Sequence, residues 1–148
     1  MVHFILSHSY IVFLIAVVIG VVLHLIVNIQ IFSGISYPYV GFAMIVIGSM
    51  LIYWAQSTSD STLKELQKTG TRDFESGPYK YSRSPTHVGL TIMTLGLAVV
   101  LNSFFIAACV IIASVITKLV FLKEEEALLE KRYGQPYRDY KKKVSSWL

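Results

Sequence analysis

The chain has 148 residues, of which 54% are hydrophobic and 15% are charged, with 13 basic and 9 acidic side chains. Soluble domains usually carry about 25% charged residues, and here no Lys, Arg, Asp or Glu precedes Asp60. This distribution excludes a soluble surface for the first third of the chain and predicts that it lies in lipid. The length allows a single domain over residues 1–148. We attribute the basic excess to the cytoplasmic side of a membrane protein, and expect no nucleic-acid partner.

Two apolar segments come first. Tyr10–Phe32 is almost continuously apolar, and Tyr39–Gln56 follows after a short turn at residues 33–38. Crossing a bilayer takes about 20 residues, with some variation. We therefore expect residues 1–56 to form two membrane spans of a generic kind.

A polar segment, Ser57–Ser76, separates these spans from the next one. Ser59 or Asp60 is a suitable N-cap for a short helix that ends near Lys68, because such side chains accept hydrogen bonds from first-turn amides. The sequence therefore predicts a second span that stops at Gln56, followed by a separate helix at the membrane surface.

A membrane hairpin is expected at residues 86–122. Pro85 suits the first position of a helix, where no amide donor is needed, and Ser84 suits its N-cap. The third span is then Thr86–Leu101, the turn is Asn102–Ser103, and the fourth span is Phe104–Leu122.

An amphipathic helix is expected from Lys123 onward. Gly134 ends it, and Pro136 opens a short final helix. Spacing of three and seven residues places a set of apolar side chains on one face of that final helix: Tyr137, Tyr140 and Val144.

The expected fold is an all-α integral membrane protein with about four transmembrane helices and a cytoplasmic amphipathic C-terminal helix. All 13 Lys and Arg residues fall in Ser57–Pro85 or from Lys118 onward. With four spans, both segments emerge on the same side, which the positive-inside rule places in the cytoplasm.

Charged side chains gather at the two ends of the hairpin. Arg83 stands beside a helix start, which offers unpaired amides to a carboxylate or phosphate. Glu125 or Glu126 is suited to bind a ligand ammonium or to pair with Arg83. The alternatives, a headgroup-binding arginine and a solvated helix start, stay open.

His87 lies one turn into the third span, as a ligand contact, a proton acceptor or a buried polar residue. Arg83, His87 and Glu126 are therefore our candidate catalytic residues. No His, Cys, Asp or Glu cluster has metal-ligand spacing, so we expect no metal.

Two motifs together resemble the isoprenylcysteine carboxyl methyltransferase family of membrane methyltransferases, and more distantly phospholipid methyltransferases. The first motif reads Gly77, Tyr79, Arg83, Ser84, Pro85, His87 and Gly89. The second reads Glu125, Glu126, Leu129, Tyr133, Gly134, Tyr137, Tyr140 and Val144. The resemblance covers residues 70–147, about half of the chain.

The resemblance implies that S-adenosylmethionine binds at the cytoplasmic face and leaves as S-adenosylhomocysteine, while a lipophilic or lipidated acceptor enters from the bilayer. It also implies a set of cofactor-binding residues. These are Thr71, Arg72, Asp73, Phe74, Tyr79, Ser84, Pro85, Thr86, His87 and Glu125.

This chain departs from the family pattern at three positions. Ser84 stands where the family has histidine, His87 where it has tyrosine, and Phe121 where some members have a basic residue. The last departure concerns the acceptor, which is an isoprenylcysteine carboxylate or another lipid-like carboxylate or amine. A carboxylate needs no deprotonation, whereas an amine does, and His87 is the nearest candidate base.

We expect Glu125 to bind the cofactor ammonium and the Ser84–Pro85 helix start to bind its carboxylate. Arg83 would then orient the acceptor or support Glu125. Two other functions stay open: a non-enzymatic membrane module that binds anionic lipid headgroups, and a reductase on a related scaffold. The expected location is a prokaryotic cytoplasmic membrane, and the oligomeric state is left open.

Overall fold

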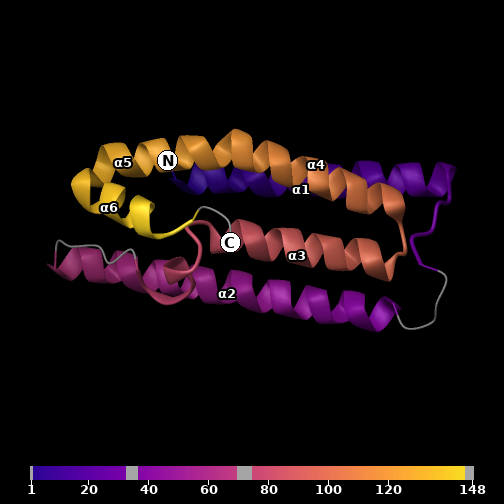
Figure 1. Cartoon of the computed structure of the whole chain (residues 1–148), viewed down its shortest axis with the longest axis horizontal. Helices are drawn as coiled ribbons and strands as arrows, with labels where there is room; N and C mark the ends of the chain where they lie inside the picture. Colours follow the sequence, from indigo (N-terminus) through magenta and orange to yellow (C-terminus); the bar gives the residue numbers. More distant parts are fainter. Residues whose placement is uncertain (1, 33–36, 70–74, 146–148) are drawn as a thin grey trace.

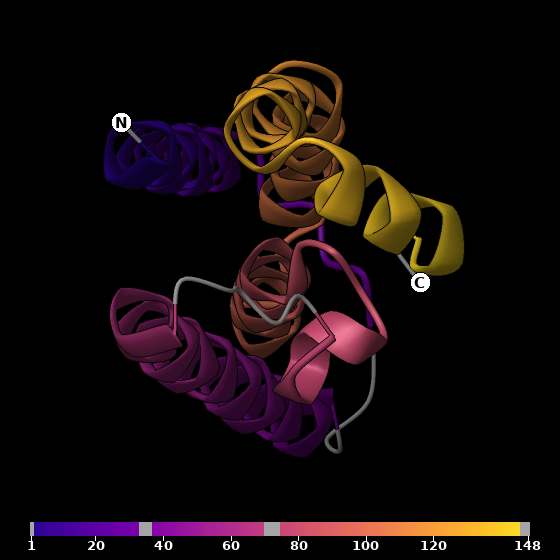
Figure 2. The ribbon, with the colours of Figure 1, turned by 90° about the vertical axis from the view of Figure 1, so that its left-hand side faces the viewer.

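A computed structural model describes residues 2–32, 37–69 and 75–145. In the described part of the chain the longer helices run lengthwise, and the shorter helices of the C-terminal segment lie at one end (Figure 1). The end-on view in Figure 2 shows α3 between α2 and α4, with α1 beside α4. The described elements are α1 (Val2–Ile26), α2 (Tyr37–Thr69), the 3-10 helix η1 (Gly77–Lys80), α3 (Pro85–Val100), α4 (Phe104–Leu119), α5 (Phe121–Tyr133) and α6 (Gln135–Lys143).

The first helix differs from the expected Tyr10–Phe32 at both ends, because it begins at Val2 and stops at Ile26. Directly after Ile26 the amides of Val27 and Ile29 still bond to backbone carbonyl oxygens, and the chain then reaches the side chain of Asn102. Asn102 Oδ1 accepts hydrogen bonds from the amides of Ile31 at 3.0 Å and Phe32 at 2.8 Å. Asn102 Nδ2 donates to the Phe32 carbonyl oxygen at 2.8 Å. Asn102 itself has φ 49°, a left-handed conformation that asparagine tolerates, which confirms the expected turn.

The expected break after Gln56 is wrong, because α2 is continuous from Tyr37 to Thr69. No Gly or Pro occurs in residues 49–69. The polar side chains bond within the helix: Ser61 Oγ donates to the Ser57 carbonyl oxygen at 2.8 Å, and Thr62 Oγ1 donates to that of Thr58 at 2.9 Å. Because this polar segment contains no helix-breaking residue and its hydroxyl groups bond within the helix, α2 continues through it.

The hairpin begins and turns where the sequence predicts. Pro85 is the first residue of α3, and Ser84 occupies the N-cap position, although its side chain makes no capping hydrogen bond. The amides of His87 and Val88 bond to the Ser84 carbonyl oxygen instead. Ser103 caps α4, with its Oγ accepting from the Ile106 amide at 3.3 Å.

The fourth long helix ends at Leu119 rather than at the expected Leu122, and α5 begins at Phe121, before the expected Lys123. The two helices follow one another in nearly the same direction (Figure 1). Gly134, with φ 63°, separates α5 from α6 as predicted. The predicted apolar face of the last segment is also confirmed as a buried cluster: Tyr137, Tyr140 and Val144.

Close backbone contacts hold α2 against α3. A Cβ atom on Gly48 would lie 2.7 Å from the Gly89 carbonyl oxygen, and one on Gly96 would lie 2.8 Å from that of Gly41. The two glycines on each helix are seven residues apart, so both pairs lie along one seam. Such small residues let membrane helices approach closely, and we made no prediction from them.

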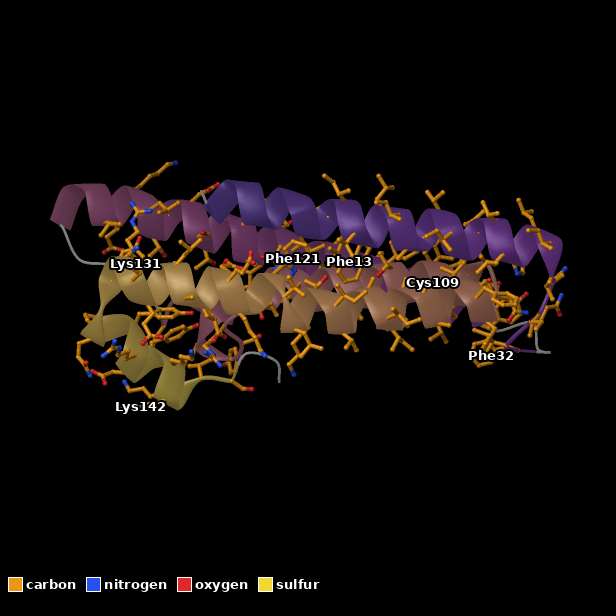
Figure 3. The ribbon with its side chains drawn as sticks, turned by 90° about the horizontal axis from the view of Figure 1, so that it is seen from above. Phe13, Phe32, Cys109, Phe121, Lys131 and Lys142 are labelled. Atoms are coloured by element: carbon orange, nitrogen blue, oxygen red, sulfur yellow. The ribbon has the colours of Figure 1, made fainter. Side chains whose placement is uncertain are left out.

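Within the described residues, Tyr37–Leu66 and Phe104–Tyr133 are long and apolar enough to cross a membrane, while Tyr10–Ile26 and Pro85–Val100 are shorter apolar helices. Figure 3 shows the labelled Lys131 and Lys142 at one end of the molecule and Phe32 at the other. The structure thus confirms an all-helical fold with two candidate spans.

Candidate functional site

The packing of the helices brings two motifs that are distant in the sequence to one end of the molecule. The C-terminal end of α2, η1 and the start of α3 lie at the same end of the molecule as α5 and α6 (Figure 1). Residues 75–89 therefore meet residues 120–145 in space, although a membrane-type hairpin separates them in sequence.

Arg83 pairs with Glu126 across this junction. Arg83 Nη1 lies 2.8 Å from Glu126 Oε1, and the two side chains are only 12% and 16% exposed. The N–H groups on Nη1 and Nε are nevertheless not aligned for a hydrogen bond with any described group. Lys141 Nζ lies 3.1 Å from Glu126 Oε2, so both oxygens of this carboxylate face a cation. The expected pair between Arg83 and a glutamate thus forms with Glu126, while the catalytic roles of both residues stay predictions.

His87 and Glu125 form a second contact at the same junction. His87 Nε2 lies 3.8 Å from Glu125 Oε2, and the His87 side chain is 3% exposed. Neither imidazole nitrogen has a hydrogen-bond partner among the described residues. Leaving a buried polar atom unpaired costs about 1–3 kcal/mol. Such atoms in a folded protein call for an explanation, and a bound ligand is one.

The final helix fixes the segment that carries Tyr79. Tyr140 Oη donates to the Tyr79 carbonyl oxygen at 2.7 Å, and the Arg83 amide donates to the Ser145 carbonyl oxygen at 2.9 Å. Gly77 begins this segment with φ 56°, and a Cβ there would lie 2.6 Å from Thr58 Oγ1 on α2. Glycine is therefore required where η1 packs on α2.

Burial raises the pKa of both tyrosines of α6, Tyr137 and Tyr140. Burial, followed by the negative charge of Glu126, raises the pKa of the Tyr137 hydroxyl, and the nearby Arg83 guanidinium opposes this only in part. Burial likewise raises the pKa of Tyr140, which keeps its hydroxyl protonated and able to donate to Tyr79 at neutral pH.

Most of the predicted site residues lie at this one junction: Tyr79, Arg83, Ser84, Pro85, Thr86, His87, Glu125 and Glu126. Ser84, Pro85, Thr86 and His87 are all buried. Thr71, Arg72, Asp73 and Phe74 lie outside the described residues. The sequence analysis did not identify Lys141, which pairs with Glu126, or Thr117, a buried residue of α4. Thr117 lies on the same face of α4 as the buried residues Val110 and Ala113, so a hydroxyl on this apolar face could have indicated it.

Removing the Tyr140 hydroxyl is expected to loosen this end of the protein. A Tyr140→Phe variant keeps the ring but leaves the Tyr79 carbonyl oxygen without this donor, which we expect to cost about 1–3 kcal/mol of unfolding free energy. Thermal unfolding in detergent, followed by tryptophan fluorescence, measures the loss. Tyr81→Phe, at a 70% exposed ring, is the matched control; equal melting temperatures for the two variants would contradict the role of this bond.

Comparison with protein families gives a match to the phospholipid methyltransferase family over residues 37–136. No curated protein and no solved structure matches the chain. The family match covers α2 through the first residues of α6, including the whole Gly77–Gly89 motif and the Glu125–Glu126 pair. It confirms the resemblance to membrane methyltransferases, and with the two candidate spans it supports a membrane protein. The chain belongs to the phospholipid methyltransferase family.

Proposed function

We propose that this protein transfers a methyl group from S-adenosylmethionine to a lipophilic acceptor at the cytoplasmic membrane face. The observation that carries the proposal is His87: a buried imidazole with both nitrogens unpartnered within the described structure, 3.8 Å from Glu125. It lies where the two family motifs meet. The acceptor is an isoprenylcysteine carboxylate or another lipid-like carboxylate or amine.

The side chains present fit this cofactor. S-adenosylmethionine carries an ammonium, a carboxylate and a sulfonium, and therefore needs both hydrogen-bond donors and acceptors. Glu125 offers a carboxylate that is 18% exposed, and we assign it to the ammonium. The Ser84–Pro85 start of α3 and the N–H groups of Arg83 are suited to the carboxylate. By resemblance, Tyr79, Thr86 and the segment Thr71–Phe74 would line the same site.

The residues of the chain would act mainly by alignment and exclusion of water. When bound, the cofactor supplies an electrophilic methyl group on a sulfonium. His87 is buried, so a reaction beside it would be shielded from water, and fixed positions for both reactants would lower the entropic part of the barrier. If the acceptor is an amine, His87 takes up its proton. Glu126, held between Arg83 and Lys141, would keep α5 and α6 in place around the site.

The membrane arrangement is part of the proposal. We infer that Tyr10–Ile26 and Pro85–Val100 cross the membrane together with the two longer candidate spans. Two connections between the spans, residues 33–38 and 102–103, carry no charged side chain, whereas the basic residues lie in the segments at the site end. This distribution supports a site on the cytoplasmic side. A prokaryotic cytoplasmic membrane is the proposed location.

Calorimetry with S-adenosylhomocysteine in detergent tests the proposal directly. We expect saturable binding with one site per chain, because the product shares the ammonium and carboxylate of the cofactor. The absence of binding, together with vesicle affinity that falls with salt, would favour a headgroup-binding module instead. Binding of a nicotinamide nucleotide in its place would favour a reductase.

A further inference from the structure

The seam between α3 and α4 contains buried hydroxyl groups whose hydrogen bonds are satisfied within the helices. Thr91 Oγ1 donates to the His87 carbonyl oxygen at 2.9 Å, and Ser114 Oγ donates to that of Val110 at 2.8 Å. The two hydroxyl oxygens lie 3.2 Å apart across the seam. These contacts fix the register of the two helices at this level.

Thr117 is different. Its side chain is 1% exposed, and its Oγ1 has no hydrogen-bond partner in the described part of the chain. Threonine in a helix commonly donates to the carbonyl oxygen four residues earlier, as Thr91 does. Thr117 therefore leaves unmade a bond that its neighbours make, at a cost that a folded protein rarely tolerates without a function.

The register places Thr117 beside His87. A short turn joins α3 to α4, so the helices are antiparallel, and Thr91 meets Ser114. One helical turn from this level leads to His87 on α3 and to Thr117 on α4. Two nearly fully buried side chains with unpartnered polar atoms thus lie at one level of one seam.

We propose that Thr117 and His87 form a subsite for a hydrogen-bonding group of the methyl acceptor, a hydroxyl or an amine rather than a carboxylate. The inference rests on the proposed methyl transfer. Thr117 lies on the apolar helix α4, about two turns before Glu125, and an acceptor that enters from the bilayer, as proposed above, would approach from that direction. Glu125, 3.8 Å from His87, disfavours an anionic group at the same place.

The Thr117→Val variant separates a ligand-binding hydroxyl from a structural one. Valine has nearly the same shape and removes an unsatisfied polar atom, so we expect the melting temperature of the ligand-free protein in detergent to rise. S-adenosylhomocysteine affinity should stay within about twofold of the parent value. The KM for phosphatidylethanolamine vesicles, assayed with radiolabelled S-adenosylmethionine, should increase about tenfold, and Thr117→Ser should restore most of the loss.

Ser114→Ala is the matched control for stability, because its hydroxyl is already bonded, so its melting temperature should fall. A lower melting temperature for Thr117→Val would overturn the inference, and so would an unchanged KM. Weaker S-adenosylhomocysteine binding by Thr117→Val would also overturn the inference, because it would indicate that Thr117 contacts the cofactor and not the acceptor. A parent protein that binds S-adenosylhomocysteine but methylates neither phosphatidylethanolamine nor the expression host's polar lipids would overturn the subsite alone. A parent that binds no S-adenosylhomocysteine would overturn the proposed function itself.

Discussion

Replacement of Glu125 by glutamine is expected to weaken S-adenosylhomocysteine binding by about 10- to 100-fold. Hydrogen bonds to a charged group contribute about 1.5–3 kcal/mol, and glutamine keeps the size of the side chain while removing its charge. The assigned partner, the ligand ammonium, then loses its counter-ion. Titration calorimetry of the purified protein in detergent measures the change.

Two neighbouring glutamates serve as controls for this experiment. Glu124 is exposed on the same helix, so Glu124→Gln should bind the ligand as the parent does. Glu126 is paired with Arg83 and Lys141, so Glu126→Gln should lower the melting temperature more than the affinity. If Glu125→Gln binds as tightly as the parent, the ammonium is bound elsewhere.

A single methyl group on Gly48 is expected to destabilise the protein by about 1–3 kcal/mol, despite the better helix propensity of alanine. The added Cβ would lie 2.7 Å from both the Gly89 carbonyl oxygen and the Met93 amide nitrogen. Both contacts are with backbone atoms, so α2 and α3 must separate to relieve them. Thermal unfolding in detergent should show a melting temperature lower by roughly 3–10 °C.

The adjacent residue provides the control for this substitution. Ile47 is 57% exposed on the outer face of α2, so Ile47→Ala changes more atoms without touching the seam. It should have little effect on the melting temperature. A Gly48→Ala protein as stable as Ile47→Ala would show that the two helices are not held by close backbone contact.

The sequence predicted those helix ends that are set by local chemistry. Pro85 and Gly134 mark boundaries because their backbones restrict or extend the available conformations, and both boundaries are confirmed. The course of the chain after α1 could not be predicted in the same way, because Asn102, about 70 residues away, bonds to the backbone of Ile31 and Phe32. The expected break in α2 is wrong because it depends on Ser59 or Asp60 as an N-cap, whereas the helix continues and Ser61 and Thr62 bond to its preceding turn.

The two sequence motifs predicted those residues of the candidate site that belong to them, and no others. The order of the two motifs pointed to a meeting of Arg83 and His87 with the glutamate pair, but only the structure distinguishes Glu126, which pairs with Arg83, from Glu125, which lies near His87. Thr117 belongs to neither motif. Its position opposite His87 depends on the register of α3 against α4, which a single sequence does not contain.

The two ends of the helix bundle respond differently to ionic strength. At the far end, Asn102 holds the chain through uncharged hydrogen bonds to the backbone of Ile31 and Phe32, which salt leaves largely intact. At the site end, the ion pairs Lys141–Glu126 and Lys143–Glu75 add to the hydrogen bond and the buried tyrosines that hold α6, and dissolved ions screen these pairs. High salt should therefore weaken the contacts at the site end more than those at the Asn102 end.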